Sequence, residues 1–128
     1  MQNALTTIEK WEKEWKDFPL PAIETPDYDL NRILRTYLPE RENLSLLEIG
    51  CAPGRWMAYF NKNFGYRVSG IEYAEQAAAL TRRNLKIQSI PTEILIEDFW
   101  KFEPEDKKFD IVFSAGFIEH FKNLPAVM

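Results

Sequence analysis

The sequence predicts an α/β fold in which a parallel sheet carries helices on both of its faces. Two observations predict it. Short apolar segments alternate with longer segments of helical periodicity, and the first apolar segment runs into a turn that contains glycine. Alternation of strands and helices is typical of βαβ units, and such units build parallel sheets. The composition, 45% hydrophobic and 28% charged residues, is that of an ordinary globular domain.

Length, charge and cysteine content exclude several classes of protein. The 128 residues have room for one domain. A net charge of -4 gives no general attraction to phosphate backbones, so we expect no nucleic-acid partner. No apolar segment approaches the roughly 18 residues of a membrane span, and we expect no membrane partner. The single cysteine, Cys51, fits a reducing, cytoplasmic setting, and one cysteine with one histidine is too few for a zinc site.

Residues 1–40 are expected to form an N-terminal helical segment that caps the rest of the chain or serves as a lid. A first amphipathic helix is predicted over residues 5–18, followed by a proline-containing linker to Pro26. A second helix is predicted before Pro39, with Asp27 or Asp29 as its cap. Its apolar stripe consists of Leu30, Ile33, Leu34, Tyr37 and Leu38.

Residues 41–128 are expected to form the α/β domain. Strands are predicted where short apolar runs occur, over residues 44–49, 66–71, 92–97 and 109–114. Helices are predicted over the segments between them that carry a helical stripe or many alanines, residues 56–64 and 74–88. A further helix is predicted to begin near Ile118.

The turn after the first strand combines small residues with an acid. Residues 46–56 read LLEIGCAPGRW, and Gly50, Ala52 and Gly54 allow backbone N–H groups to approach a ligand closely. The dinucleotide pattern G-x-G-x-x-G would put Arg55 where helix and strand must pack closely, which disfavours a nicotinamide-dependent dehydrogenase. The carboxylate of Glu48 would repel a pyrophosphate, but it suits a ligand that carries an ammonium and a sulfonium.

Residues 46–56 resemble the first motif of class I (Rossmann-like) S-adenosylmethionine-dependent methyltransferases. The resemblance implies that this turn surrounds the amino-acid and ribose parts of the cofactor. The residues that it assigns to the cofactor are Glu48, Gly50, Cys51, Ala52 and Gly54. Ala52 replaces the middle glycine of the family pattern. The competing interpretation is a βα turn whose glycines serve packing alone, and a buried, unreactive Cys51 is favoured over a nucleophile.

Two further strand ends agree with the same family. Glu72, with Tyr73 after it, follows Gly54 by 18 residues, close to the spacing of roughly 20 of a ribose-binding acid. By resemblance Glu72 binds the ribose hydroxyls. The third strand leads into Asp98 and Phe99, which occupy the place of the family's adenine-binding motif. Ordinary turn chemistry is the alternative for Asp98.

The fourth predicted strand leads into a segment that many small-molecule methyltransferases share. Residues 109–121 read FDIVFSAGFIEHF, and the resemblance places Ser114, Ala115 and Gly116 beside the methionine part of the cofactor. His120, the single histidine, is favoured as a residue that holds its loop. Its alternative role, a general base for the acceptor, makes it a weak catalytic candidate.

A complete domain of this family has seven strands in the order 3-2-1-4-5-7-6, whereas this chain supplies four, in the expected order 3-2-1-4. We therefore expect a truncated domain whose fourth strand is an open edge, at which two copies can pair as a homodimer. The predicted function is methyl transfer from S-adenosyl-L-methionine to a small-molecule substrate by in-line displacement, without a metal. A non-catalytic S-adenosylmethionine-binding protein or fragment is the alternative, and the activity of a truncated chain is left open.

Overall fold

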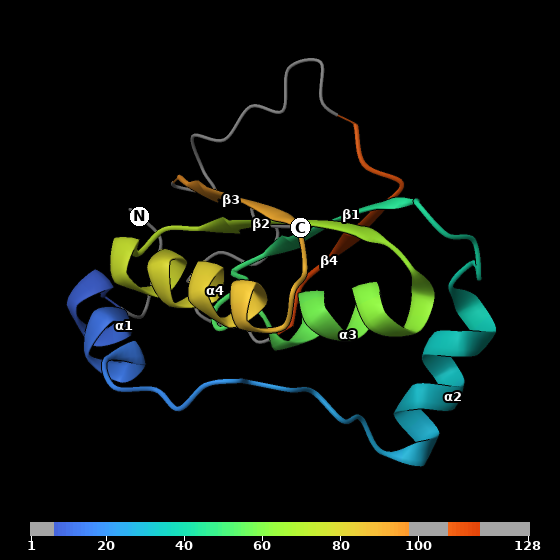
Figure 1. Ribbon diagram of the computed structural model, residues 1–128, viewed down its shortest axis with the longest axis horizontal. Coiled ribbons are helices and arrows are strands. Elements are labelled where there is room, and N and C mark those ends of the chain that lie inside the picture. Colours follow the sequence, from blue (N-terminus) through green and yellow to red (C-terminus); the bar gives the residue numbers. More distant parts are fainter. Residues whose placement is uncertain (1–6, 98–107, 116–128) are drawn as a thin grey trace.

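A computed structural model describes residues 7–97 and 108–115 of the chain (Figure 1). Each strand predicted from the sequence is present, and so is each helix predicted within these residues; the helix expected near Ile118 lies outside them. The elements in chain order are α1 (Ile8–Trp15), α2 (Tyr28–Tyr37), β1 (Ser45–Ile49), α3 (Arg55–Phe64), β2 (Arg67–Glu72), α4 (Glu75–Ile87), β3 (Thr92–Ile96) and β4 (Ile111–Phe113).

The four strands form one parallel sheet in the order β3-β2-β1-β4, which confirms the predicted topology. β1 is the central strand, and Leu46 pairs with Val68 on one side and with Ile111 on the other. The side chain of Asp110 holds β4 in this register, because its Oδ2 accepts a 2.8 Å hydrogen bond from the Ser45 N–H. β1 therefore has a hydrogen-bonded neighbour on each side, and its end lies at the middle of the sheet.

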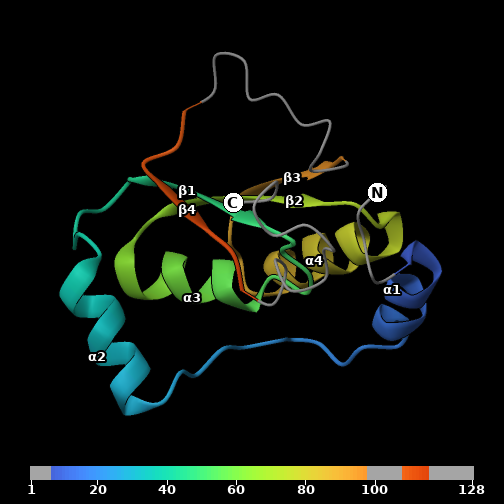
Figure 2. The same cartoon turned by 180° about the vertical axis from the view of Figure 1, so that it is seen from behind.

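Helices α3 and α4 cover the same face of the sheet (Figures 1 and 2). The crossovers from β1 to β2 and from β2 to β3 run in one direction across the sheet, and right-handed crossovers in one direction place their helices on one face. Residues 98–107 and 116–128 lie outside the described part of the chain. Helices were predicted on both faces of the sheet, and the described residues show them on one face.

An aromatic cluster joins α3 to the sheet. Phe60 is fully buried at its centre, 4.9 Å from the Phe113 ring and 6.2 Å from the Tyr66 ring between centroids. The other rings of the cluster are Trp56, Tyr59 and Phe64. Aromatic pairs at these separations contribute about 0.5–1.5 kcal/mol each beyond the area that they bury. The cluster fixes the axis of α3, and with it the place where the turn after β1 must enter the helix.

Helix α2 uses only part of its predicted apolar stripe. Leu34 and Leu38 pack against the core, whereas Leu30, Ile33 and Tyr37 are 37%, 47% and 80% exposed. Only one side of the helix meets the domain, where the Tyr59 hydroxyl of α3 donates to Asn31 and the Arg35 guanidinium lies over the Phe64 ring. Of the two candidate caps Asp27 is correct, since its Oδ1 accepts from the Leu30 N–H at 2.8 Å.

The linker between α1 and α2 runs along the side of α3 and α4 that faces away from the sheet (Figures 1 and 2). α1 packs against α4, so the N-terminal segment contacts the α/β domain at both of its ends. Among the helices of the described residues, none has the length and hydrophobicity that a membrane crossing requires.

Candidate functional site at the carboxyl edge of the sheet

The predicted site residues meet where the parallel strands end. Register pairs Glu48 of β1 with Gly70 of β2 and with Phe113 of β4, and Ser114 follows directly after Phe113. Glu72 ends β2 next to them. In open α/β sheets, ligands bind outside the carboxyl ends of the strands, at the point where the strand order reverses. Here this point lies between β1 and β4, beside Glu48 and Ser114.

The N–H groups of the turn after β1 are engaged within the protein. Those of Gly50 and Cys51 both donate to the Ile71 carbonyl, at 2.9 and 3.3 Å, and that of Ala52 donates to Glu72 Oε2 at 3.2 Å. This differs from the expectation that these groups face a ligand. The conformation of the turn is therefore set by hydrogen bonds within the protein.

Gly54 is required by both its conformation and its surroundings. Its φ of +91° is one that residues with a side chain rarely adopt, and a Cβ there would lie 2.9 Å from Thr81 Cγ2. Gly54 caps α3 without a side-chain hydrogen bond, so the cap residue leaves the first N–H groups of this helix without a side-chain partner of its own. Ala52 adopts no such positive φ, which explains how an alanine replaces the family's middle glycine.

Gly70 of β2 leaves space for the turn that follows β1. A Cβ at this position would lie 2.5 Å from Cys51 Sγ and 3.1 Å from Met57 Sδ. Cys51 is buried, and burial, together with the charges of Glu72 and Glu48, raises the pKa of its thiol. A neutral, buried thiol is a packing residue, which supports the favoured interpretation of Cys51 over a nucleophile.

Two buried polar atoms at this edge find no hydrogen-bond partner among the described residues. They are Glu48 Oε1 and Ser114 Oγ. Glu48 is only 3% exposed, and burial, reinforced by the charge of Glu72 and opposed by Arg55, raises the pKa of its carboxyl well above the usual range. Buried polar groups in proteins are nearly always paired, so unpaired ones indicate a ligand or water that completes them.

Glu72 links the turn to the start of α4. Its Oε2 accepts from the Ala52 N–H, and its Oε1 accepts from the N–H groups of Tyr73 at 3.1 Å and Ala74 at 3.4 Å. Burial raises the pKa of this carboxyl, and the three backbone hydrogen bonds act in the opposite direction. A carboxylate offers about four acceptor positions, so the half-buried group can still accept hydrogen bonds from a ligand.

The structure brings most of the predicted site residues to one edge of the sheet and leaves four outside the described residues. The residues at the edge are Glu48, Gly50, Cys51, Ala52, Gly54, Glu72, Tyr73, Ser114 and Ala115. Asp98, Phe99, Gly116 and His120 lie outside the described ranges. Within those ranges no group of His, Cys, Asp and Glu residues could hold a metal ion.

The sequence analysis missed Asn84. This residue of α4 is fully buried, and its Nδ2 donates to the Pro53 carbonyl of the turn at 2.8 Å. The pattern held a signal for it, because Asn84 occupies an inward-facing helical position between Leu80 and Leu85 in an otherwise largely apolar stripe. Arg55, at the start of α3, forms an ion pair with Glu24 at 3.3 Å.

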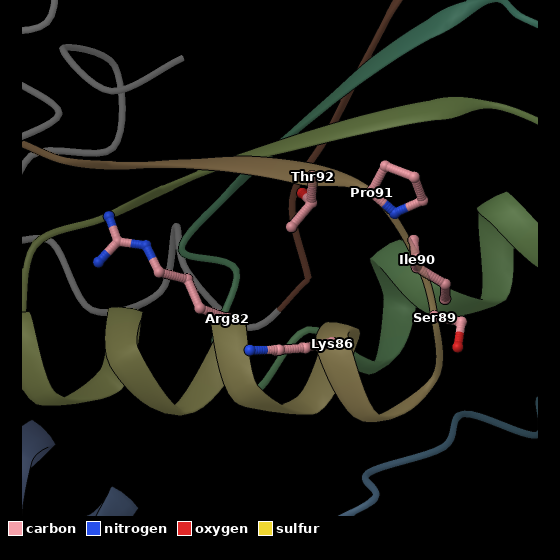
Figure 3. A pocket seen from close by; sticks show the side chains of 6 residues that line it. All are labelled: Arg82, Lys86, Ser89, Ile90, Pro91 and Thr92. Atoms are coloured by element: carbon pink, nitrogen blue, oxygen red, sulfur yellow. The ribbon is translucent and has the colours of Figure 1, made fainter.

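A separate hollow of about 310 Å³ opens at the other end of β3 (Figure 3). Its lining residues are Arg82, Lys86, Ser89, Ile90, Pro91 and Thr92. Thr92 begins β3, so this hollow lies at the amino ends of the strands and away from the acidic edge. Arg82 is engaged there with the protein, since its Nη2 donates to the Ile94 carbonyl at 2.8 Å.

Three of the solved structures that share this fold illustrate the similarity. A structure from a study of the conversion of a disulfide bond into a thioacetal group during echinomycin biosynthesis has a TM-score of 0.71 at 17% identity, over 91% of this chain and 50% of its own. Phosphoethanolamine N-methyltransferase 2 from Haemonchus contortus, in complex with phosphomonomethylethanolamine and S-adenosylhomocysteine, has a TM-score of 0.67 at 24% identity. The match covers 91% of this chain and 28% of that protein. A methyltransferase from Thiobacillus denitrificans, in complex with S-adenosyl-L-homocysteine, has a TM-score of 0.62 at 16% identity. The match covers 87% of this chain and 44% of that protein.

The chain spans half or less of the length of each of these three proteins. No curated protein matches the sequence significantly. A family model described as a methyltransferase domain matches residues 46–128, well over half of the chain, and this range contains every predicted cofactor residue. On this match, and with the strand order and fold described above, the chain belongs to the methyltransferase-domain family.

Proposed function

We propose that the chain binds S-adenosyl-L-methionine at the carboxyl edge of its sheet and takes part in methyl transfer to a small-molecule acceptor. One observation carries the proposal. Within the family-matched residues, the buried and unpartnered atoms Glu48 Oε1 and Ser114 Oγ lie at the edge where such folds bind ligands. Both atoms require a polar partner that the described residues do not supply.

The charge of the edge fits this ligand better than a dinucleotide. S-Adenosylmethionine carries an ammonium and a sulfonium, and carboxylates in a partly buried setting attract cations more strongly than they would in water. The carboxylate of Glu72 would repel a pyrophosphate, and the N–H groups of Gly50, Cys51 and Ala52 are already engaged, which leaves only the start of α3 for an anion. These features weigh against the nicotinamide-dependent dehydrogenase.

Each site residue has a proposed role in holding the cofactor. Glu72 accepts hydrogen bonds from the ribose hydroxyls, and Glu48 binds the ammonium group. The uncapped start of α3 suits the carboxylate of the amino-acid part. The remaining contacts are proposed from the family resemblance. They are Gly50, Cys51, Ala52, Gly54 and Tyr73 around the amino-acid and ribose parts, Ser114, Ala115 and Gly116 beside the methionine part, and Asp98 and Phe99 at the adenine.

When bound, the cofactor supplies an activated methyl group on sulfur that is open to in-line displacement. The contribution of the chain is to orient this group toward the acceptor and to exclude water. Alignment of two reacting groups can supply about 7–11 kcal/mol of a barrier. We propose that His120 holds its loop; acting as a base on the acceptor is the weaker alternative.

The acceptor is proposed as a small molecule. In support, the Haemonchus contortus enzyme of the same fold was crystallised with phosphomonomethylethanolamine. The alternative is a protein that binds the cofactor without catalysis. The observation that supports it is that the predicted site residues within the described ranges are all assigned to the cofactor and none to the acceptor.

Titration calorimetry of the chain with S-adenosylmethionine, S-adenosylhomocysteine and NAD tests the proposal. We expect the first two to bind and NAD not to bind. Glu72→Gln should weaken S-adenosylhomocysteine binding by about tenfold or more, because a hydrogen bond to a charged group is worth about 1.5–3 kcal/mol. Glu75→Gln, an exposed acid in the first turn of α4, is the matched control. Binding of NAD alone would sink the proposal.

Wider proposals concern the division of the chain into segments and its cellular setting. We propose residues 1–40 as a helical cap or lid and residues 41–128 as an incomplete cofactor domain. We propose a reducing, cytoplasmic setting, because the one cysteine is a buried free thiol; labelling of the chain in fractionated cells would test it.

We further propose that two copies can pair along β4. It is an edge strand among the described residues, and its Val112 is 60% exposed. A monomer at every concentration in light scattering would contradict such pairing.

A further inference from the structure

Asn84 joins three parts of the chain that are far apart in sequence. From its fully buried place in α4, its Nδ2 donates to the Pro53 carbonyl at 2.8 Å and to the Ala22 carbonyl at 3.1 Å. Its Oδ1 accepts from the Ala22 N–H at 2.9 Å. Pro53 lies 31 residues away, within the turn after β1, and Ala22 lies 62 residues away, in the N-terminal linker.

Gln88 and an ion pair strengthen the same junction. Gln88 Nε2 donates to the Ala22 carbonyl at 3.1 Å and to Asn84 Oδ1 at 2.9 Å. Glu24 Oε2 lies 3.3 Å from Arg55 Nε at the start of α3. We call residues 22–24 the strap. Figures 1 and 2 show the linker that contains it running along α3 and α4.

The amide of Asn84 is fully used. An asparagine has two N–H donors and an oxygen that accepts two hydrogen bonds, and the contacts with Pro53, Ala22 and Gln88 employ all four. A leucine would fill the same helical position without exposing polar atoms to the core. The specific property of asparagine here is that it connects the strap to the turn.

Opposite sides of the turn are held by two different side chains. Glu72 accepts from the Ala52 N–H on one side, and Asn84 donates to the carbonyl of the next residue, Pro53. A shift of either partner would tilt the peptide between them. Gly54, which follows, is confined by contact with Thr81. The conformation of the turn therefore depends on where Asn84 is held, and Asn84 is bonded to the strap.

We propose that Asn84 is a positioning residue that couples docking of the strap to the shape of residues 50–54, and through them to the affinity for the cofactor. This inference rests on the proposed function. Because coupling between two sites is reciprocal, bound cofactor must stabilise the docked strap by the same factor by which the docked strap favours the cofactor. The linker is then part of the cofactor site.

A pair of variants tests the coupling. Asn84→Asp keeps an acceptor for the Ala22 N–H but replaces the donor with an oxygen that faces two carbonyls. It should weaken S-adenosylhomocysteine binding by about tenfold or more, measured by calorimetry well below the midpoint of thermal unfolding. Gln88→Ala removes the bonds of Gln88 to the Ala22 carbonyl, to Asn84 Oδ1 and to Lys62, and it leaves the Asn84–Pro53 bond. Its loss of affinity should therefore be smaller, about two- to threefold.

Hydrogen exchange of the unmodified chain supplies a second readout that does not depend on how a variant folds. Saturating S-adenosylhomocysteine should slow exchange of the backbone amides of residues 22–24 severalfold, while the hydrogen-bonded amides in the middle of α2 stay unchanged. An unchanged strap, or Asn84→Asp binding within twofold of the wild type, would overturn the inference alone. A wild-type chain that does not bind S-adenosylhomocysteine would overturn the proposed function, and the inference with it.

Discussion

The two ends of the sheet differ in the features that they offer to a ligand. The carboxyl edge has buried acids, a turn shaped by close glycine contacts, and two buried polar atoms without partners among the described residues, Glu48 Oε1 and Ser114 Oγ. The amino edge has the hollow of about 310 Å³, lined by exposed cationic side chains (Figure 3). The proposed site is therefore marked by buried polar groups and not by hollow space.

The cationic residues of the amino edge have a structural explanation that Glu48 of the carboxyl edge lacks. Lys86 lies in the last turn of α4, where a cation stabilises the negative end of the helix dipole. Arg82 donates to a strand carbonyl. Glu48, in contrast, lies buried in the central strand, where folding gains nothing from a carboxyl. Under the proposed function its presence is explained by the cofactor, and each of the following predictions tests that contrast.

The largest expected effect is on stability at the carboxyl edge. Gly70→Ala places a methyl group 2.5 Å from Cys51 Sγ and should lower the free energy of unfolding by about 1–3 kcal/mol, the usual cost of overpacking a core. Urea denaturation with circular dichroism measures the change.

A double-mutant cycle serves as the control for this clash. Cys51→Ala removes the sulfur, so Gly70→Ala should cost less stability in that background than in the wild type. If Gly70→Ala alone lowers the free energy of unfolding by less than about 0.5 kcal/mol, the turn can shift to accommodate the methyl group, and contact with β2 does not fix its shape.

A smaller effect is expected for Glu48 and depends on pH. Burial raises the pKa of its carboxyl, so at intermediate pH the folded chain retains a proton that the unfolded chain has released. Stability conferred by this group is complete below the unfolded pKa of about 4.3 and is lost as the pH rises through the folded pKa. Glu48→Gln should therefore be more stable than wild type near pH 8, by on the order of 1 kcal/mol.

Thermal unfolding of wild type and Glu48→Gln between pH 4 and 8 tests this, since the gap should close at the acidic end. The same variant should bind S-adenosylmethionine less tightly, because the carboxyl serves binding at the expense of stability. A variant less stable than wild type at pH 8 would show that Glu48 is a structural residue.

The smallest effect is expected at the amino edge. Lys86→Ala should change the free energy of unfolding by no more than about 0.5 kcal/mol, as is usual for exposed positions. It should leave S-adenosylhomocysteine affinity within twofold of wild type, measured by calorimetry. A tenfold loss of affinity would reverse the comparison and place the ligand at the basic hollow.

The sequence predicted the strands well because each is bounded by a local signal. Thr92 follows Pro91, and β1 ends before Gly50. The site at the carboxyl edge followed from the acids at two strand ends, since topology alone brings the ends of parallel strands together. Predictions failed where the partner of a residue is remote. The α2 stripe predicted contacts for Leu30, Ile33 and Tyr37, but only Leu34 and Leu38 meet the core.

By itself, the sequence determined where the strands lie along the chain, the glycine-containing turn and the acids that follow the strands, because periodicity and short spacing act within one segment. The expected order of the strands in the sheet came from the family resemblance. Only the tertiary structure decided how the polar groups are paired. It engaged the turn N–H groups with Ile71 and Glu72, gave Glu48 Oε1 no partner among the described residues, and joined Asn84 to a linker 62 residues away. Hydrogen bonds between distant segments form only after the chain has packed, so no local pattern specifies them.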